Sequence, residues 1–408
     1  MNDQVLYWLW LSLRPRLGAK GLRGLLETFG PPDALYAADA EALKRAGLAP
    51  GLCQALLDKN LAPARAILQD CERLNLTVLT PDAAGYPAAL RQTDDAPAVL
   101  YCRGRLPDFD RQPRIGLVGA RQADARGLDL AGRFGAEIAA CGGVVVTGMA
   151  KGIDAAAAHG ALAQGRPVVG VLGCGADVVY PRENAALFQL VAEQGCLLSE
   201  YPPGTAPNAR HFPARNRIIS ALSDAVVVIQ AAEGSGALIT ARWAAEQGRE
   251  VFSVPGPAGD PLSRGCNQLL REGALLAESG LDVMREYLYR YPGAVRMQNV
   301  ECKMQNEGSG IKDQGSGDSG VGAVIGRPQS ETGNPSSATA GAPAVRPLPE
   351  NLSPVQTAIV TALENGPLQL DALIDKTGLP AAQVLPQLTV LQIKGVISQA
   401  PGKIYQLR

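Results

Sequence analysis

Three segments of the chain share a pattern that suits anion binding: an apolar run, then small residues with glycine, then a helix start. They are Ile115–Arg121, Val144–Asp154 and Val226–Thr240. Backbone N–H groups at a helix start have no partner inside the helix and lie at the positive end of its dipole, so they attract phosphate. We therefore expect a surface that binds several phosphates.

Basic and aromatic side chains lie between the second and third of these segments. The run from 201 to 223 has no acidic residue, but it contains Arg210, Arg215 and Arg217 beside Phe212. Arginine suits forked contacts to phosphate and stacking on bases, and an aromatic ring beside basic groups is typical of proteins that bind single-stranded nucleic acid. Residues two apart diverge on a regular helix, so Arg215 and Arg217 can share a ligand only if one lies at or before the first helical turn.

Plainer interpretations exist for two of the cations. Arg121 could pair with Asp124 or Asp129, and Lys151 could be an ordinary solvated lysine. We expect Gly152 to shape the turn before its helix rather than to perform chemistry. The sequence alone leaves these alternatives open.

The residues that position these groups alternate between strand-like and helix-like patterns from 81 to 290. This alternation predicts a parallel sheet with helices on both faces, a Rossmann-like α/β fold. Right-handed crossovers place the carboxyl ends of the strands at one edge, which gathers the basic turns there. If the strand order is doubly wound, the loops after the first and fourth strands should flank the crevice. The expected strands are 115–119, 144–148, 168–172, 197–200, 225–230 and 250–254.

The rest of the chain divides into three further segments. Residues 1–80 have helical periodicity and paired glycine turns, which fit helix-hairpin-helix (SAM-like) units or a small helical bundle that only packs. Residues 291–348 are rich in Gly, Ser and Pro, as in a flexible linker. Residues 349–408 predict three helices and a hairpin, the plan of a winged helix. The third helix has no basic residue before Lys394, so we expect it to dock protein rather than to grip duplex DNA.

Composition excludes several classes of protein. The chain has 408 residues, 46% of them hydrophobic and 19% charged, with a net charge of −1, which fits a multidomain globular protein that is not polycationic overall. Its eight cysteines include no C-x-x-C pair, and with two histidines beside them a structural metal site is not expected. The N-terminus lacks a basic region before its apolar stretch, so we expect no signal peptide, no membrane span and a cytoplasmic location.

Signatures of common nucleotide-dependent enzymes are also missing from the sequence. Gly116-Leu-Val-Gly119-Ala-Arg121 lacks the third glycine of a dinucleotide loop, and no acidic residue closes the second strand. The chain has neither a Walker-type phosphate loop nor a G-x-S-x-G elbow. We therefore expect neither catalytic residues nor a cofactor.

A set of short motifs between residues 81 and 276 carries a resemblance to one family. In chain order they include Tyr86-Pro-Ala-Ala-Leu90, Val118-Gly-Ala-Arg121, Thr147-Gly-Met-Ala-Lys-Gly-Ile-Asp154, Leu172-Gly-Cys-Gly-Ala-Asp177, Ser199-Glu-Tyr-Pro202, Phe212-Pro-Ala-Arg-Asn-Arg-Ile-Ile219 and Ser235-Gly-Ala-Leu-Ile-Thr-Ala241. In sequence and order they strongly resemble the DNA-processing protein A family, also called Smf. The helical N-terminal and winged-helix C-terminal segments fit the architecture of that family.

The resemblance implies a cytoplasmic bacterial protein, not an enzyme, that binds and protects incoming single-stranded DNA during natural transformation and helps to load the RecA-type recombinase. Members of the family form homodimers through the Rossmann-like domain and bind DNA in its basic pocket. Ala120 stands where the family commonly has serine, which removes one hydroxyl but keeps the backbone amide. The positions that match the pocket are Arg121, Lys151, Arg215 and Arg217, and we add Gly119, Gly152, Phe212, Asn216, Ser235 and Gly236 as candidate DNA-binding residues.

A competing interpretation is an enzyme. The run Gly234-Ser-Gly-Ala-Leu-Ile-Thr240 resembles the phosphate loop of lysine-decarboxylase-like nucleotide phosphoribohydrolases, P-G-G-x-G-T-x-x-E. In this chain Thr240 stands at the position of the glutamate that acts on the sugar, and Ala237 at that of the loop threonine. Hydrolysis is therefore the alternative, and DNA binding is the interpretation that we prefer.

Overall fold

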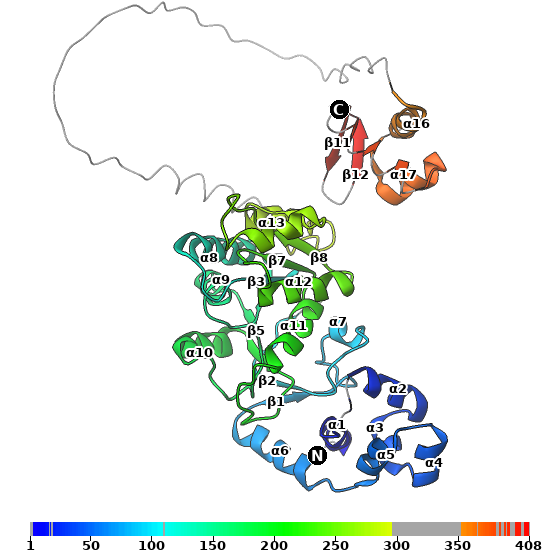
Figure 1. Cartoon of the computed structure of the whole chain (residues 1–408), viewed down its shortest axis with the longest axis vertical. Coiled ribbons are helices and arrows are strands. Elements are labelled where there is room, and N and C mark those ends of the chain that lie inside the picture. Colours follow the sequence, from blue (N-terminus) through cyan, green and yellow to red (C-terminus); the bar gives the residue numbers. More distant parts are fainter. Residues whose placement is uncertain are drawn as a thin grey trace, which may run out of the picture. The chain divides into compact units, whose positions relative to one another are not determined.

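The computed structural model describes residues 3–15, 17, 19–108 and 111–295, and in the C-terminal part 352–364, 366–380, 383–384, 387–388, 390–391, 396–400 and 404–407. The chain divides into two units, residues 1–300 and 301–408. The first unit holds the N-terminal helices and a large sheet, and the second holds the C-terminal helices and hairpin (Figure 1).

Helices α1 to α6 fill the N-terminal part of the first unit and bury an apolar core of their own. Trp10, Leu9, Leu35, Leu43 and Leu56 are fully buried in this core. Burying an apolar side chain of this size contributes roughly 1.5–3 kcal/mol, which fixes the short helices against one another. The helices are α1 (Asp3–Ser12), α2 (Ala19–Phe29), α3 (Pro32–Ala37), α4 (Ala40–Arg45), α5 (Pro50–Leu57) and α6 (Ala62–Arg73).

A mixed sheet forms the centre of the first unit, in the order β1-β2-β6-β5-β4-β3-β7-β8-β9. Strands β3 to β9 are parallel to one another, whereas β2 is antiparallel to β6 and β1 to β2. The predicted Rossmann-like sheet is confirmed, because β3 to β8 lie where the sequence predicts strands. The bounds are β1 (Thr77–Leu79), β2 (Leu100–Gly104), β3 (Arg114–Val118), β4 (Val144–Thr147), β5 (Val168–Leu172), β6 (Cys196–Ser199), β7 (Ala225–Val228), β8 (Glu250–Ser253) and β9 (Leu275–Leu276).

Helices cover both faces of this sheet, because side chains alternate from one face of a strand to the other. Val145 of β4 joins the core under α8, α9, α10 and α14, whereas its neighbours Val144 and Val146 join the core under α11 and α12. Figure 1 shows the two helical layers on opposite sides of the strands. The bounds are α7 (Ala88–Arg91), α8 (Ala125–Ala140), α9 (Ile153–Ala163), α10 (Ala185–Gln194), α11 (His211–Leu222), α12 (Gly236–Glu246), α13 (Arg264–Arg271) and α14 (Gly280–Arg285).

The strand order reverses between β3 and β7. The chain adds β4, β5 and β6 on one side of β3, and α11 then carries it across the sheet to β7 on the other side. The crevice is therefore flanked by the loops after the first and fifth predicted strands. The expectation that the loops after the first and fourth predicted strands flank the crevice is wrong. The fourth predicted strand, β6, pairs with β5, and the chain crosses to the other side of β3 only after it.

In its described residues, the second unit contains a small sheet packed against helices α16 and α17. Ser353 caps the first helix through a reciprocal pair of hydrogen bonds with Gln356, and this unit has its own core around Ile359 and Leu373. Most of the predicted third helix and the tip of the hairpin, like residues 296–348 of the predicted linker, lie outside the described residues. The bounds are α16 (Pro354–Leu363), β10 (Leu368–Gln369), α17 (Leu370–Thr377), β11 (Ile397–Ala400) and β12 (Ile404–Leu407).

Candidate nucleic-acid interface

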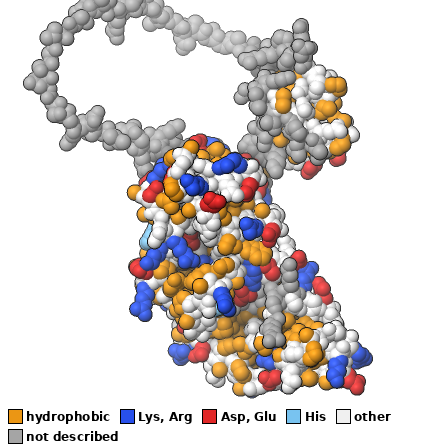
Figure 2. Space-filling model, viewed as in Figure 1, with side chains coloured by type: hydrophobic (Ala, Val, Ile, Leu, Met, Phe, Trp, Pro, Cys, Tyr) orange, Lys and Arg blue, Asp and Glu red, His pale blue; other side chains and the backbone are white. Residues whose placement is uncertain are grey.

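Two hollows lie at the edge of the sheet where the parallel strands end. The smaller is a cavity of about 140 Å³, and the larger is a groove of about 810 Å³. The cavity brings together side chains that follow β3, β4 and β5 with others from α11, as the fold predicts for a parallel sheet. On the face of the first unit that Figure 2 shows, lysine and arginine are interspersed with hydrophobic and acidic side chains and form no continuous basic patch. The residues that border both hollows are Arg121, Ala150, Tyr180, Phe212 and Arg215.

Glycine lets the loops after β3 and β4 approach each other closely. Gly152 has φ +76°, and a Cβ there would collide with the backbone oxygen of Ala120. A Cβ on Gly119 would lie 2.6 Å from Cγ1 of Ile153 at the start of α9. These two candidate residues therefore shape the site by close packing, which brings Arg121 over the cavity.

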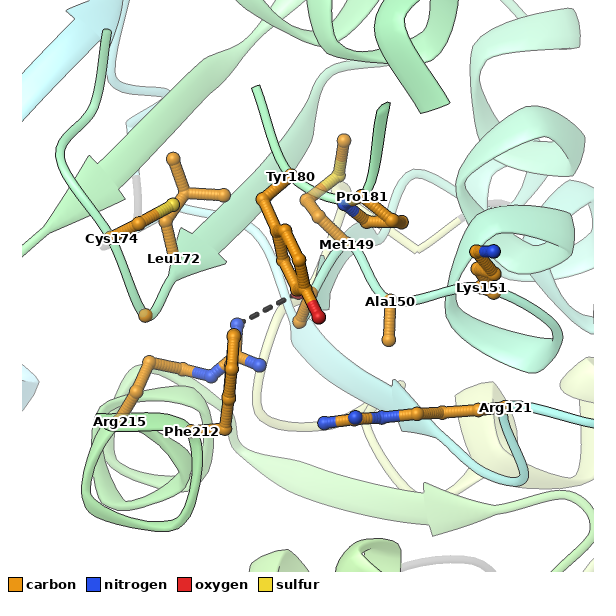
Figure 3. Close-up of a pocket in the computed structure, with 12 residues that line it drawn as sticks. Arg121, Met149, Ala150, Lys151, Leu172, Cys174, Tyr180, Pro181, Phe212 and Arg215 are labelled. Atoms are coloured by element: carbon orange, nitrogen blue, oxygen red, sulfur yellow. Dashed lines mark hydrogen bonds between the residues drawn. The ribbon is translucent and has the colours of Figure 1, made fainter. Parts of the chain in front are cut away.

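Arg121 lies over one ring of an aromatic pair at the mouth of the cavity. Its guanidinium carbon lies 5.3 Å from the ring centre of Phe212, and the Phe212 ring stacks on Tyr180 at 5.3 Å with an interplanar angle of 27° (Figure 3). Among the described residues Arg121 has no ion pair. Asp124 instead caps α8, accepting a hydrogen bond from the Gly127 amide at 2.7 Å. The alternative pairing of Arg121 with Asp124 is therefore not what the structure contains.

Arg215 forms the floor of the cavity and is only 4% exposed. One terminal nitrogen donates hydrogen bonds to the carbonyl oxygens of Gly148, at 2.8 Å, and Val171. Burial lowers the pKa of Arg215 to about 10, although the nearby carboxylate of Asp154 opposes this shift. The Nε atom of Arg215 is buried and has no hydrogen-bond partner among the described residues.

Asp154 secures the turn that follows β4. Its carboxylate accepts hydrogen bonds from the amides of Gly148 and Ala150, at 3.1 and 3.4 Å, and the side chain is buried. Burial raises the pKa of Asp154, while Arg215 and the backbone amides act against this rise. Asp154 and Arg215 thus form a buried pair in which the carboxylate balances the charge of the guanidinium in the cavity floor.

Lys151 lies on the rim of the cavity and is paired with a carboxylate. Its Nζ lies 2.6 Å from Oε1 of Glu183, and both side chains are more than half exposed. This hydrogen bond holds the pKa of Glu183 below its ordinary value. The next residue, Asn184, donates to the carbonyl oxygens of Met149 and Ala150, so the loop after β5 fastens the loop after β4.

Arg217 lies outside both hollows. Because α11 begins at His211, Arg215 and Arg217 both lie beyond its first turn and point in different directions. Arg217 is only 11% exposed and forms ion pairs with Asp95 and Glu200. Of the three candidate arginines and Lys151, it is the one that lines neither the cavity nor the groove.

The groove extends from Arg121 to the start of α12. Ser235 caps this helix by accepting a hydrogen bond from the Ala237 amide at 3.4 Å, and Gly236 follows it. Asn216 of α11 donates to the carbonyl oxygen of Gly236 at 3.2 Å. The groove thus has a helix N-terminus in its wall, a position that favours anions.

Tyr180 and Glu183 are not among the predicted site residues, although Tyr180 lines both hollows and Glu183 pairs with Lys151. Both residues follow β5. Because the carboxyl ends of parallel strands meet at one edge of the sheet, their place after a strand was the sequence signal that could have assigned them to the site. Among the described residues no cluster of three or more His, Cys, Asp or Glu side chains could hold a metal ion. No helix in the described part of the chain is long and apolar enough to cross a membrane.

The reversed strand order, with helices on both faces of the sheet, defines a Rossmann-like protein, and arginine, lysine and aromatic side chains line a cavity at the edge of its sheet. The chain belongs to the family of DNA recombination-mediator protein A, whose family model matches residues 77–288. A second model, the DprA winged helix domain, matches residues 342–403. Both the predicted family and the predicted winged helix are confirmed.

Individual relatives support this assignment. Protein Smf of Synechocystis sp. is 34% identical, and the similarity covers 100% of both chains. DNA processing protein DprA of Bacillus subtilis is 44% identical over 49% of this chain and 68% of its own length. The X-ray structure of DprA from Streptococcus pneumoniae has a TM-score of 0.61 at 33% identity, covering 70% of this chain and 97% of that one. None of these matches favours the phosphoribohydrolase alternative.

Proposed function

We propose that the first unit binds single-stranded DNA at the cavity and groove. The observation that carries this proposal is the stacked pair of Phe212 and Tyr180 at the mouth of the cavity, with the guanidinium of Arg121 over the Phe212 ring. Stacking on aromatic rings tolerates any base, and it requires bases that are not already paired in a duplex. Arg121 is also free to meet a phosphate, because it has no ion pair among the described residues.

The size of the cavity supports one unpaired base as its occupant. A dry cavity of about 150 Å³ holds a ring of the size of benzene, and this cavity measures about 140 Å³. Its walls include Met149, Leu172 and Pro181, which are apolar, and the buried side chain of Arg215 closes its floor. An entering base would therefore meet a mostly apolar surface.

The adjoining groove is suited to the sugar-phosphate backbone. Ser235, Gly236 and Asn216 line it at the start of α12, and Lys151 lies on the rim of the adjoining cavity. Contacts to the backbone carry no sequence information, so we expect affinity for single strands with little dependence on sequence.

We propose further that the chain holds DNA without cleaving it. In the phosphoribohydrolase alternative, a glutamate would be needed where this chain has Thr240, and that side chain is only 1% exposed within α12. Incubation with nucleoside monophosphates tests the point. No release of free base is expected, and measurable release would favour the enzyme.

The cellular role that we propose is that of a cytoplasmic mediator of natural transformation, which protects incoming DNA and helps to load a RecA-type recombinase. The support is the family, described as a DNA recombination-mediator protein, and relatives in two bacteria that are named DNA processing proteins. A homodimer is part of the proposal. Leu275 and Leu276 on the edge strand β9 are 41% and 55% exposed, and they offer an apolar edge to a second copy.

The remaining segments are assigned accessory roles. We propose residues 1–80 as a helical domain, 81–290 as the DNA-binding domain, 291–348 as a linker and 349–408 as a winged helix that docks protein. A chain that ends at residue 348 should keep most of its affinity for single strands.

A binding assay with fluorescent oligonucleotides tests this function. The full chain and the chain ending at 348 are compared on a single strand and on a duplex of the same length. Tight binding to the single strand by both proteins is the expected result. Equal affinity for the duplex, or loss of binding in the shortened chain, would contradict the assignment of the site.

A further inference from the structure

Arg217 is enclosed by carboxylates on the side of α11 that faces away from the cavity. Its Nε lies 3.2 Å from Oδ2 of Asp95, and one terminal nitrogen lies 2.7 Å from Oε1 of Glu200. The other terminal nitrogen donates to the carbonyl oxygen of Ala214 at 3.3 Å. Each of the three guanidinium nitrogens thus has a partner within the protein.

These contacts join three separate segments of the chain. Asp95 lies between α7 and β2, Glu200 directly follows β6, and Arg217 lies in the middle of α11. The exposed side-chain fractions of Arg217, Asp95 and Glu200 are 11%, 15% and 27%, so water screens the three charges only in part. Burial alone would lower the pKa of Arg217, but Glu200 and Asp95 outweigh burial and raise it.

The same helix carries two residues of the proposed interface between its N-terminus and Arg217. Phe212 stacks on Tyr180, and Arg215 forms the cavity floor. An α-helix moves as a rod, with a rise of about 1.5 Å per residue, so a shift at Arg217 is transmitted to Phe212. Among the described residues, Arg217 is the one side chain of α11 that forms ion pairs.

We propose that Arg217, Asp95 and Glu200 form a clamp that positions α11 for DNA binding, and that Arg217 itself does not contact the strand. This inference rests on the proposed DNA-binding function, and it assigns Asp95 and Glu200 a role in that function. Because the clamp acts through Phe212 and Arg215, the three charged residues of the clamp itself are positioning residues.

The sign of the effect at Glu200 separates this proposal from a direct phosphate contact. If Arg217 bound phosphate, Glu200 would compete with the DNA, and its neutralisation would strengthen binding and steepen the salt dependence. If Glu200 positions α11, its neutralisation weakens binding although it removes a negative charge near a polyanion. No loss of a phosphate contact then accompanies the change, so the salt slope is unchanged.

The experiment measures the affinity of full-length chains for a single-stranded oligothymidine at several salt concentrations, together with thermal unfolding. The variants are Glu200→Gln, Asp95→Asn, Arg217→Gln and Arg217→Lys. Each should weaken binding about tenfold, equal to about 1.4 kcal/mol, with the slope of log affinity against log salt unchanged. Arg217→Lys should resemble Arg217→Gln, because a lysine cannot hold both carboxylates at once.

The matched control is Arg23→Gln. Arg23 also loses two carboxylate partners, Glu27 and Asp94, but its side chain is 53% exposed and lies on α2. This control removes the same charge as Arg217→Gln and should leave affinity within about twofold, because exposed ion pairs contribute little.

Three results have distinct meanings. Stronger binding by Glu200→Gln, or a wild-type affinity in Arg217→Lys, would assign Arg217 to a phosphate and overturn the clamp. A lower melting temperature with unchanged affinity in all four variants would reduce the cluster to a structural ion pair and also overturn it. If the wild-type chain itself fails to bind the strand, the proposed function fails, which is a different outcome from failure of the clamp in a chain that binds.

Discussion

The guanidinium carbon of Arg121 lies over the ring of Phe212, 5.3 Å from the ring centre. The two residues come from different parts of the chain, the loop after β3 and the first turn of α11. A cation over an aromatic face contributes roughly 0.5–1 kcal/mol at an exposed site. This contact therefore fixes a charge and a stacking surface side by side, the pair of features that a single strand requires.

Replacement of Phe212 by leucine tests the stacking surface. The change keeps an apolar side chain but removes the ring, so affinity for a single strand should fall by about 1–3 kcal/mol, the contribution of base stacking per aromatic side chain. The salt slope should stay at the wild-type value, because no charge is lost. Titration of a labelled oligonucleotide at several salt concentrations measures both quantities. A flattened slope would show that the ring only holds Arg121.

Neutralisation of Glu183 tests whether Lys151 is free to meet phosphate. Glu183→Gln releases Lys151 from the contact at 2.6 Å. We expect a gain in affinity of about twofold to fivefold, because exposed ion pairs contribute little. The gain should disappear in the double variant that also carries Lys151→Gln. Weaker binding by Glu183→Gln would indicate that the pair organises the loop instead.

Replacement of Gly152 by alanine tests the close approach of the two loops. A Cβ at this position would meet the backbone of Ala120 and Arg121, and φ is +76°. Both stability and DNA affinity should fall, because the loop that carries Arg121 must move. The control is Gly165→Ala, whose φ is +65° but whose Cβ would meet nothing within 4 Å. It should lose about 1 kcal/mol of stability with no change in affinity.

Asp224 gives the fold a specific dependence on pH. Its buried carboxylate accepts hydrogen bonds from Nε and Nη2 of Arg114, at 2.9 and 2.7 Å, and from the Tyr291 hydroxyl at 3.0 Å. Burial alone would raise the pKa of Asp224, but the hydrogen bonds and charge of Arg114 outweigh burial and lower it. The contribution to stability is therefore complete above the ordinary pKa, about 3.9, and is lost as pH falls through the lower folded value.

The variant Asp224→Asn should lose about 3–5 kcal/mol of unfolding free energy at pH 7, because Arg114 would remain buried without its carboxylate. The difference from wild type should shrink below about pH 3.9. Asp70→Asn is a suitable control, since its ion pair with Arg73 is at least half exposed, and it should change stability by less than about 1 kcal/mol. Denaturant titrations across this pH range give the comparison, and a difference that grows as the pH falls would contradict the sign.

Much of the sheet could be predicted because its strands carry strong local signals. Val144–Thr147 and Ala225–Val228 are short apolar runs with glycine or polar residues after them, and such runs favour buried parallel strands. The order of the strands was not accessible in the same way. Pairing of β3 with β7 joins residues more than a hundred positions apart, and no local pattern reports it.

The site was predictable where a residue type and its place after a strand coincide, as for Arg121 and Lys151. It was not predictable where the role depends on a distant partner. Tyr180 has meaning only because Phe212 stacks on it, and the direction of Arg217 is set by Asp95 and Glu200. Such contacts arise from the tertiary fold, and the helical spacing only indicates that neighbouring arginines diverge.

The salt dependence of single-strand binding by Arg121→Gln tests the central claim most directly. Each phosphate that a protein neutralises on a single strand contributes roughly −0.7 to the slope of log affinity against log salt. Since Arg121 is the cation at the cavity mouth that no carboxylate holds in the described residues, its loss should weaken binding and make the slope less steep by about 0.7. Wild-type affinity together with a wild-type slope in this variant would contradict the account.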